Sequence, residues 1–149
     1  MCSPRGFGLL HRDVSPSNVV LVADERGRTR PVLIDFGLAR AAGPGVTETL
    51  TRMVTPGFSP PESYGGDASR AGPATDVYGL AATLYHALAG RLPASSVERQ
   101  QGIPLEPLRK VRPEVSRPVA DAVHDGLELD PGHRPATMAA FLARLGLGG

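Results

Sequence analysis

Three oxygen-bearing side chains near the start of the chain have the spacing of a site that handles phosphate. Asp13 and Asn18 lie in "HRDVSPSN" at residues 11–18, and Asp35 lies in "VLIDFGLAR" at residues 32–40. A carboxylate such as Asp13 can orient an attacking hydroxyl group and accept its proton. The amide oxygen of Asn18 and the carboxylate of Asp35 are ligands that Mg²⁺ prefers. Together these residues predict a site that holds a metal triphosphate opposite a hydroxyl group.

A β-hairpin is expected to bring Asn18 and Asp35 together. Residues 18–23, "NVVLVA", and 30–34, "RPVLI", are β-branched and aliphatic runs separated by the polar turn "DERGRT". Such a pattern predicts two antiparallel strands. A single Asp or Asn beside a strand is usually a turn former. The joint spacing of the three residues is what favours the chemical interpretation.

The rest of the chain reads as a long loop followed by helices. Residues 41–66 are rich in Gly, Pro, Thr and Ser and predict a loop without regular elements. The segment "TDVYGLAATLYHALAG" predicts an apolar helix that begins with Thr75 or Asp76 as its N-cap and ends at Gly90. Two further amphipathic helices are expected within 118–130 and 136–146. The apolar face of the first helix is expected to form the core, with Val77, Leu80, Ala81, Leu84 and Leu88 at helical spacing.

Composition narrows the classes of protein. The 149 residues are 41% hydrophobic and 21% charged, which is typical of one soluble globular domain. A net charge of +1 indicates neither nucleic acid nor a membrane surface as partner. The single cysteine cannot form an internal disulfide, and the four histidines lack metal-ligand spacing. Neither a signal peptide nor a membrane-spanning run is expected, so we expect a cytoplasmic protein.

Five segments together resemble the protein kinase catalytic domain of the Ser/Thr type. They are "HRDVSPSN", "DFG", "TPGFSPPE", "TDVYGLAATLYHALAG" and "DPGHRP", and they occur in the family's order from Gly8 to Leu145. "HRDVSPSN" is most similar to bacterial members. The resemblance implies an α+β, mainly α fold: a kinase-like C-terminal lobe with a small β-hairpin. It also implies transfer of the ATP γ-phosphate to a Ser or Thr hydroxyl of a protein substrate, with ATP and Mg²⁺ as cofactors.

The resemblance also implies roles for single residues of the catalytic loop. Asp13 matches the catalytic Asp, and Asn18 and Asp35 match the magnesium ligands. Arg12 matches the basic residue that reads a phosphorylated activation loop, with a solvated surface pair as the alternative.

The activation segment, residues 35–62, contains candidate regulatory threonines. Thr55 matches the family Thr that contacts the catalytic loop. Thr47 and Thr49 resemble autophosphorylation positions, where added negative charge could pair with Arg12. The alternative for both is an ordinary loop threonine.

Three residues match structural positions of the family. Glu62 in "PPE" resembles the Glu that pairs with a distant Arg, here Arg134 in "GHRP". Asp76 resembles the Asp that hydrogen-bonds the backbone of the catalytic loop. Its alternative role is a simple N-cap, which Asp favours.

Two departures from the family pattern bear on activity. Ser15 stands where Ser/Thr kinases usually carry a Lys that neutralises the transferring phosphoryl group, and Val54 replaces the usual Gly before Thr55. Only ten residues precede His11, and "GFG" at residues 6–8 does not fit the phosphate-covering loop. We therefore expect residues 1–149 to form a partial kinase domain without an N-lobe.

Such a chain is expected not to catalyse phosphoryl transfer alone. A separate N-lobe or a kinase partner would complete it. The alternatives are a non-catalytic, pseudokinase-like binding module and a gene fragment without an independent role.

Overall fold

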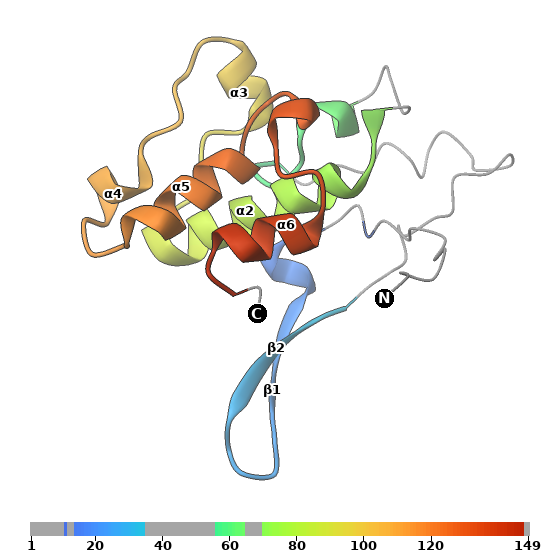
Figure 1. Ribbon diagram of the computed structural model, residues 1–149, viewed down its shortest axis with the longest axis vertical. Helices are drawn as coiled ribbons and strands as arrows, with labels where there is room; N and C mark the ends of the chain where they lie inside the picture. Colours follow the sequence, from blue (N-terminus) through green and yellow to red (C-terminus); the bar gives the residue numbers. More distant parts are fainter. Residues whose placement is uncertain (1–10, 12–13, 35–55, 65–69, 148–149) are drawn as a thin grey trace, which may run out of the picture.

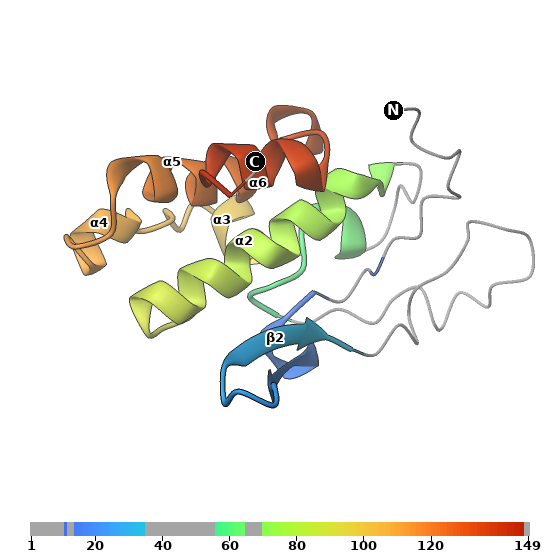
Figure 2. The same cartoon turned by 60° about the horizontal axis from the view of Figure 1, so that its bottom comes forward.

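A small hairpin and a helical body make up the described structure. The computed structural model describes residues 11, 14–34, 56–64 and 70–147 (Figure 1). The elements in chain order are η1 (Pro16–Asn18), β1 (Val19–Ala23), β2 (Thr29–Leu33), η3 (Pro61–Tyr64), α2 (Pro73–Ala89), α3 (Ser96–Gln100), α4 (Leu108–Val111), α5 (Arg117–Gly126), η5 (Pro131–His133) and α6 (Met138–Arg144). Figure 2 shows α2 running between the hairpin and the other helices.

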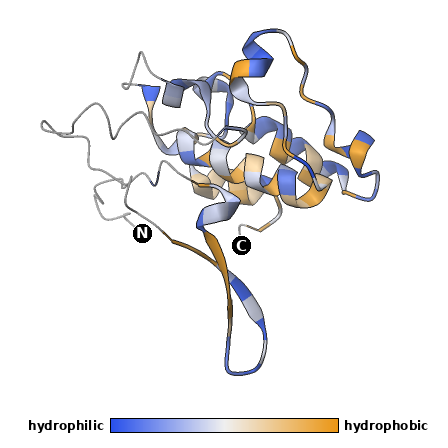
Figure 3. Ribbon diagram, turned by 180° about the vertical axis from the view of Figure 1, so that it is seen from behind, coloured by the Kyte–Doolittle hydropathy of each residue, from blue (hydrophilic) through white to orange (hydrophobic). Residues whose placement is uncertain are grey.

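The hairpin predicted from residues 18–23 and 30–34 is confirmed. Strands β1 and β2 pair antiparallel, with Val19 opposite Leu33 and Ala23 opposite Thr29. The turn closes because the Asp24 carboxylate accepts the backbone N–H groups of Arg26 and Arg28, each at 2.8 Å. Gly27 supplies the left-handed backbone with φ of 73°. Figure 3 shows apolar residues where the hairpin leaves the body and polar residues at its turn.

Helix α2 begins earlier than the sequence prediction placed it. Its N-cap is Gly72, and Pro73 follows at the first helical position, so neither Thr75 nor Asp76 is the N-cap. Proline is suited to that position because its missing N–H would have no partner in the helix. At the other end the prediction holds: Gly90 terminates the helix with φ of 76°.

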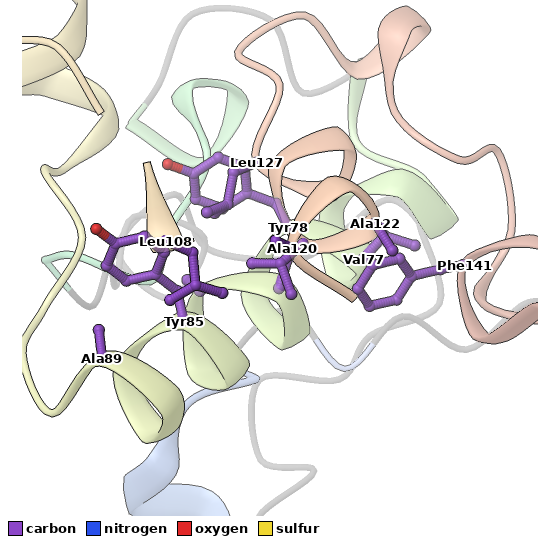
Figure 4. Close-up of a cluster of buried hydrophobic side chains, with 12 residues drawn as sticks. Val77, Tyr78, Tyr85, Ala89, Leu108, Ala120, Ala122, Leu127 and Phe141 are labelled. Carbon is purple, nitrogen blue, oxygen red and sulfur yellow. The ribbon is translucent and has the colours of Figure 1, made fainter. Parts of the chain in front are cut away.

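The hydrophobic core forms around α2, with contributions from α4, α5 and α6 (Figure 4). The predicted face of α2 is only partly correct. Val77 and Ala81 are fully buried, whereas Leu80, Leu84 and Leu88 are half-buried and pack at the edge of the core. Aromatic and small side chains fill the centre instead, and α5 approaches α2 so closely that a Cβ on Gly126 would lie 2.6 Å from the Ala81 Cβ. The buried hydrophobic side chains of α2 are Val77, Tyr78, Ala81, Ala82, Tyr85 and Ala89.

Two segments for which the sequence predicted no element contain short helices. The segment expected to lack elements, residues 41–66, contains η3 in its described part. The connector between α2 and α5 contains α3 and α4. Both amphipathic helices expected after this connector are confirmed as α5 and α6, with Val123 and Phe141 fully buried. Within the described residues, no helix has the length and apolar character needed to cross a membrane.

Candidate active site

The structure describes four of the residues singled out as site residues: Asn18, Glu62, Asp76 and Arg134. The other six lie outside the described residues, and they are Arg12, Asp13, Asp35, Thr47, Thr49 and Thr55. The described residues closest to Asp13 and Asp35 in the sequence are His11, Val14 and Ile34, and the contacts of all three are defined.

Helix α2 contacts His11 and Val14, the described residues on either side of Arg12 and Asp13. The backbone N–H of His11 donates to Asp76 Oδ2 at 2.9 Å. On the other side, a methyl group on Gly79 would lie 2.7 Å from the carbonyl oxygen of Val14 and 2.9 Å from its Cβ. Only a residue without a Cβ permits this approach. The backbone on either side of Arg12 and Asp13 is therefore packed against one helix.

His11 also joins the hairpin to this segment. Its side chain donates from Nε2 to the carbonyl oxygen of Ile34 at 2.9 Å, and the residue is only 3% exposed. Burial of a polar ring is favourable only when its nitrogen atoms find partners. The end of β2 is thus tied to the start of the "HRDVSPSN" segment.

Asn18 lies at the base of the hairpin, next to Ile34. Its N–H donates to Ser15 O at 3.0 Å, which closes the turn of η1, and its carbonyl oxygen accepts the Ile34 N–H at 2.7 Å. Asn18 is 6% exposed. Asp35 is the next residue in the sequence after Ile34.

Ser15, at the position where the family usually carries Lys, is buried. It is 1% exposed, and its hydroxyl shares a hydrogen bond of 2.8 Å with the hydroxyl of Ser17. This pairing satisfies a polar group that would otherwise be costly to bury. Sequence reasoning missed Ser17 as its partner.

Glu62 and Arg134 form a buried, bidentate ion pair between η3 and the end of η5. Arg134 Nη1 donates to Glu62 Oε2 at 2.7 Å and Nη2 to Oε1 at 2.9 Å. The two side chains are 0% and 2% exposed. The Arg134 guanidinium group also lies over the ring of Tyr78, 5.0 Å from its centre. This is the long-range pair expected between the loop and the helical base.

The carboxyl group of Glu62 is held in its charged form. Burial acts to raise its pKa, but the hydrogen bonds and the charge of Arg134 outweigh burial, so that the pKa lies below its ordinary value. Thr75 adds a hydrogen bond from Oγ1 to Glu62 Oε2 at 2.9 Å. Thr75 Oγ1 in turn accepts the Gly72 N–H at 3.1 Å, which explains why Thr75 favours the helix start without being its cap.

Asn18 and Asp35 have the chemistry of a magnesium site. Their donors are an amide oxygen and a carboxylate, which suit a hard divalent cation. The Ile34 N–H donates to the backbone carbonyl oxygen of Asn18. Asn18 therefore lies next to the residue that precedes Asp35 in the sequence. Among the residues that the structure describes, no three His, Cys, Asp or Glu side chains gather as a metal site. Because Asp35 lies outside the described residues, the magnesium site on Asn18 and Asp35 stays a prediction.

Comparison with known proteins identifies the family. The pattern of the protein kinase domain family matches residues 6–144. Serine/threonine-protein kinase PknK of Mycobacterium tuberculosis is 37% identical over 142 residues, which cover 89% of this chain and 12% of PknK. Serine/threonine-protein kinase PkaA of Streptomyces coelicolor is 37% identical over 142 residues, or 92% of this chain and 25% of PkaA.

A solved structure agrees with these relatives. The PknI kinase domain of Mycobacterium tuberculosis superposes with a TM-score of 0.63 and 31% identity, covering 95% of this chain and 48% of that chain. The chain thus spans about half of the solved kinase domain and a quarter or less of the two curated relatives. The chain belongs to the protein kinase domain family, in its bacterial serine/threonine type.

Proposed function

We propose that this chain is the C-terminal lobe of a serine/threonine kinase domain and supplies the catalytic loop for phosphoryl transfer to a protein hydroxyl. The observation that carries the proposal is the double attachment of the catalytic segment to α2. Asp76 accepts the His11 N–H, and Gly79 packs against Val14, so α2 holds the described residues on both sides of the Arg12–Asp13 pair. Catalytic groups work best when rigid elements hold them in place.

In this proposal Asp13 accepts the proton of the attacking hydroxyl group. Asn18 and Asp35 hold Mg²⁺, which neutralises charge that develops on the transferring phosphoryl group of ATP. The hydrogen bond from the Ile34 N–H to the Asn18 carbonyl oxygen supports this assignment, because it brings the residue before Asp35 next to Asn18. We assign Arg12, Thr47, Thr49 and Thr55 to regulation: phosphorylated Thr47 or Thr49 would pair with Arg12.

A second lobe is required for turnover in this proposal. The match covers 48% of the solved PknI kinase domain, so we propose that a segment outside these 149 residues supplies the other half of the site. A separate N-lobe or a kinase partner in the cytoplasm would supply it. Residues 1–149 then form a partial kinase domain.

A non-catalytic binding module is the second candidate. Ser15 favours it, because a buried serine paired with Ser17 cannot supply the positive charge of the usual Lys. Loss of one charge-stabilising donor costs about 3 to 4 kcal/mol in transition-state stabilisation in other enzymes.

Phosphate transfer from labelled ATP to a protein substrate tests the proposal. We expect no turnover by the chain alone, turnover when an N-lobe is added, and its loss in Asp13→Asn. Turnover unchanged by Asp13→Asn would remove Asp13 from the role of base.

Titration calorimetry with Mg·ATP gives a second test, in which submillimolar affinity of the chain alone would contradict the need for a second lobe. Added N-lobe without any turnover would favour the binding module.

A further inference from the structure

A hollow between α5 and the segment that leads into α4 has no place in phosphoryl transfer. Its volume is about 340 Å³, close to the lower end of the roughly 300 to 1,000 Å³ typical of ligand sites. Leu108, fully buried, and Ala120, 3% exposed, are the most buried of its lining residues, and Leu105 and Pro107 also line it. The hollow can therefore receive an apolar side chain.

Two arginine side chains line the same hollow. Arg109 donates from Nε to the Val115 carbonyl oxygen at 3.1 Å, which anchors its guanidinium group. Its terminal nitrogen atoms have no acceptor in the described part of the chain. Arg117, the first residue of α5, forms neither an ion pair nor a side-chain hydrogen bond with the described residues. Other exposed arginines, such as Arg91, do have carboxylate partners.

The charge of the hollow is positive but small. Asp121 lines it one turn after Arg117, so two arginines and one aspartate leave a charge of +1. His124 adds none, because its Nε2 accepts the Leu108 N–H at 3.0 Å and burial, with the charge of Arg99, lowers its pKa. A densely charged nucleic-acid backbone or membrane surface would gain little from a single net charge. A short acidic protein segment, with carboxylates placed to reach Arg109 and Arg117, suits this hollow better.

We propose that this hollow docks an extended acidic segment of a partner protein. An apolar side chain of the segment enters between Leu108 and Ala120, and flanking carboxylates pair with Arg109 and Arg117. The proposal does not depend on catalysis: it concerns the face formed by α4 and α5 and involves none of the proposed catalytic residues.

Fluorescence anisotropy with a defined probe tests this docking. The probe is a fluorescein-labelled peptide, Gly-Glu-Leu-Glu-Asp-Leu-Gly, added to the full chain. We expect saturable binding that weakens about tenfold in R109E/R117E, because two half-exposed ion pairs are lost and reversed in charge. The control is Lys110→Glu, which makes a single charge reversal beside Arg109 at a residue that does not line the hollow, and it is compared with Arg109→Glu alone as well as with the double variant. It should weaken binding less than about threefold, since only screened charge changes.

Three outcomes would overturn the proposal. These are no binding of the probe, equal weakening by R109E/R117E and Lys110→Glu, and binding to phosphatidylserine vesicles without binding to the peptide. A probe with serine in place of leucine should also bind more weakly.

Should the double variant fail to fold, amide NMR shifts of the unmodified chain give the answer. They should move at Arg109, Arg117 and Ala120 on addition of the peptide, and shifts confined to other residues would refute the docking. The same result is expected in Asp13→Asn, which separates this test from that of catalysis.

Discussion

The guanidinium group of Arg134 uses all five of its N–H groups inside the protein. Besides the two bonds to Glu62, it donates to the carbonyl oxygens of Glu128 at 2.6 Å, Ala74 at 3.0 Å and Leu129 at 3.0 Å. A buried ion pair offsets its desolvation only when such additional hydrogen bonds are present. Arg134 thereby joins η3, the start of α2 and the chain after α5 in one polar cluster.

Removal of this arginine should be costly. We expect Arg134→Met to lower the free energy of unfolding by about 3 to 5 kcal/mol, because it leaves the Glu62 charge buried without its partner. Urea denaturation followed by circular dichroism measures the change. The matched control is Arg144→Met, which breaks the half-exposed pair with Asp125 and should cost less than about 1 kcal/mol. Equal losses in the two variants would contradict the role given to Arg134.

At the scale of single residues, some contacts can be predicted from the sequence and others cannot. The ion pair between Glu62 and Arg134 could be predicted because both residues lie in segments that resemble kinase motifs. Thr75 could not be recognised as the third member of the cluster, since its hydroxyl group reaches Glu62 only once η3 lies against α2. The Ser15 to Ser17 bond was equally hidden, because serine hydroxyl groups have many local partners in a chain.

At the scale of elements, α2 is the support for His11 and Val14, which flank the proposed catalytic residue Asp13. Gly79 is the contact point, because its missing side chain lets the helix touch Val14. Sequence periodicity predicted the helix and its C-terminal glycine but gave no reason for a glycine in its middle. Helices α3 and α4 were missed because four or five residues are too few to show a periodic pattern. The Ser95 and Glu98 capping box was the available signal for α3.

Substitution of Gly79 separates packing from helix propensity. Alanine is intrinsically favoured in helices by about 0.5 to 1 kcal/mol, yet its methyl group would overlap Val14, at a cost of about 1 to 3 kcal/mol. We therefore expect Gly79→Ala to destabilise the chain in thermal denaturation. The control Ala87→Gly, at an exposed position of α2, measures the propensity contribution alone. A stabilised Gly79→Ala variant would show that α2 and Val14 do not touch.

At the scale of the whole molecule, the half-buried His124 and the buried carboxyl group of Glu62 make stability depend on pH in the same direction. Burial and the charge of Arg99 lower the pKa of His124 from 6.5, and the pKa of Glu62 is lowered from 4.5. Each group takes up a proton more readily in the unfolded chain than in the folded one. Their stabilising contributions are therefore complete above the unfolded values and are lost as the pH falls toward the folded ones.

We expect the free energy of unfolding to decline in two stages on acidification. The first begins below about pH 6.5 through His124 and the second below about pH 4.5 through Glu62, following their unfolded pKa values. His124→Gln should abolish the first stage and retain the second, as measured by urea denaturation at several pH values. His133→Gln, at an exposed position, should retain both stages. A first stage that survives in His124→Gln would assign it to another group.

The hairpin projects from the helical body, and this determines where the chain can tolerate changes in length. Its turn, Asp24 to Arg28, is stabilised by its own hydrogen bonds and points away from the helical body (Figure 1). Insertions or deletions there would alter the reach of the two strands without repacking the helices. Changes of equal length in the two strands would preserve the antiparallel register of the remaining pairs and the anchorage at Asn18. The turn is thus the place where length variation and grafted tags are tolerated best.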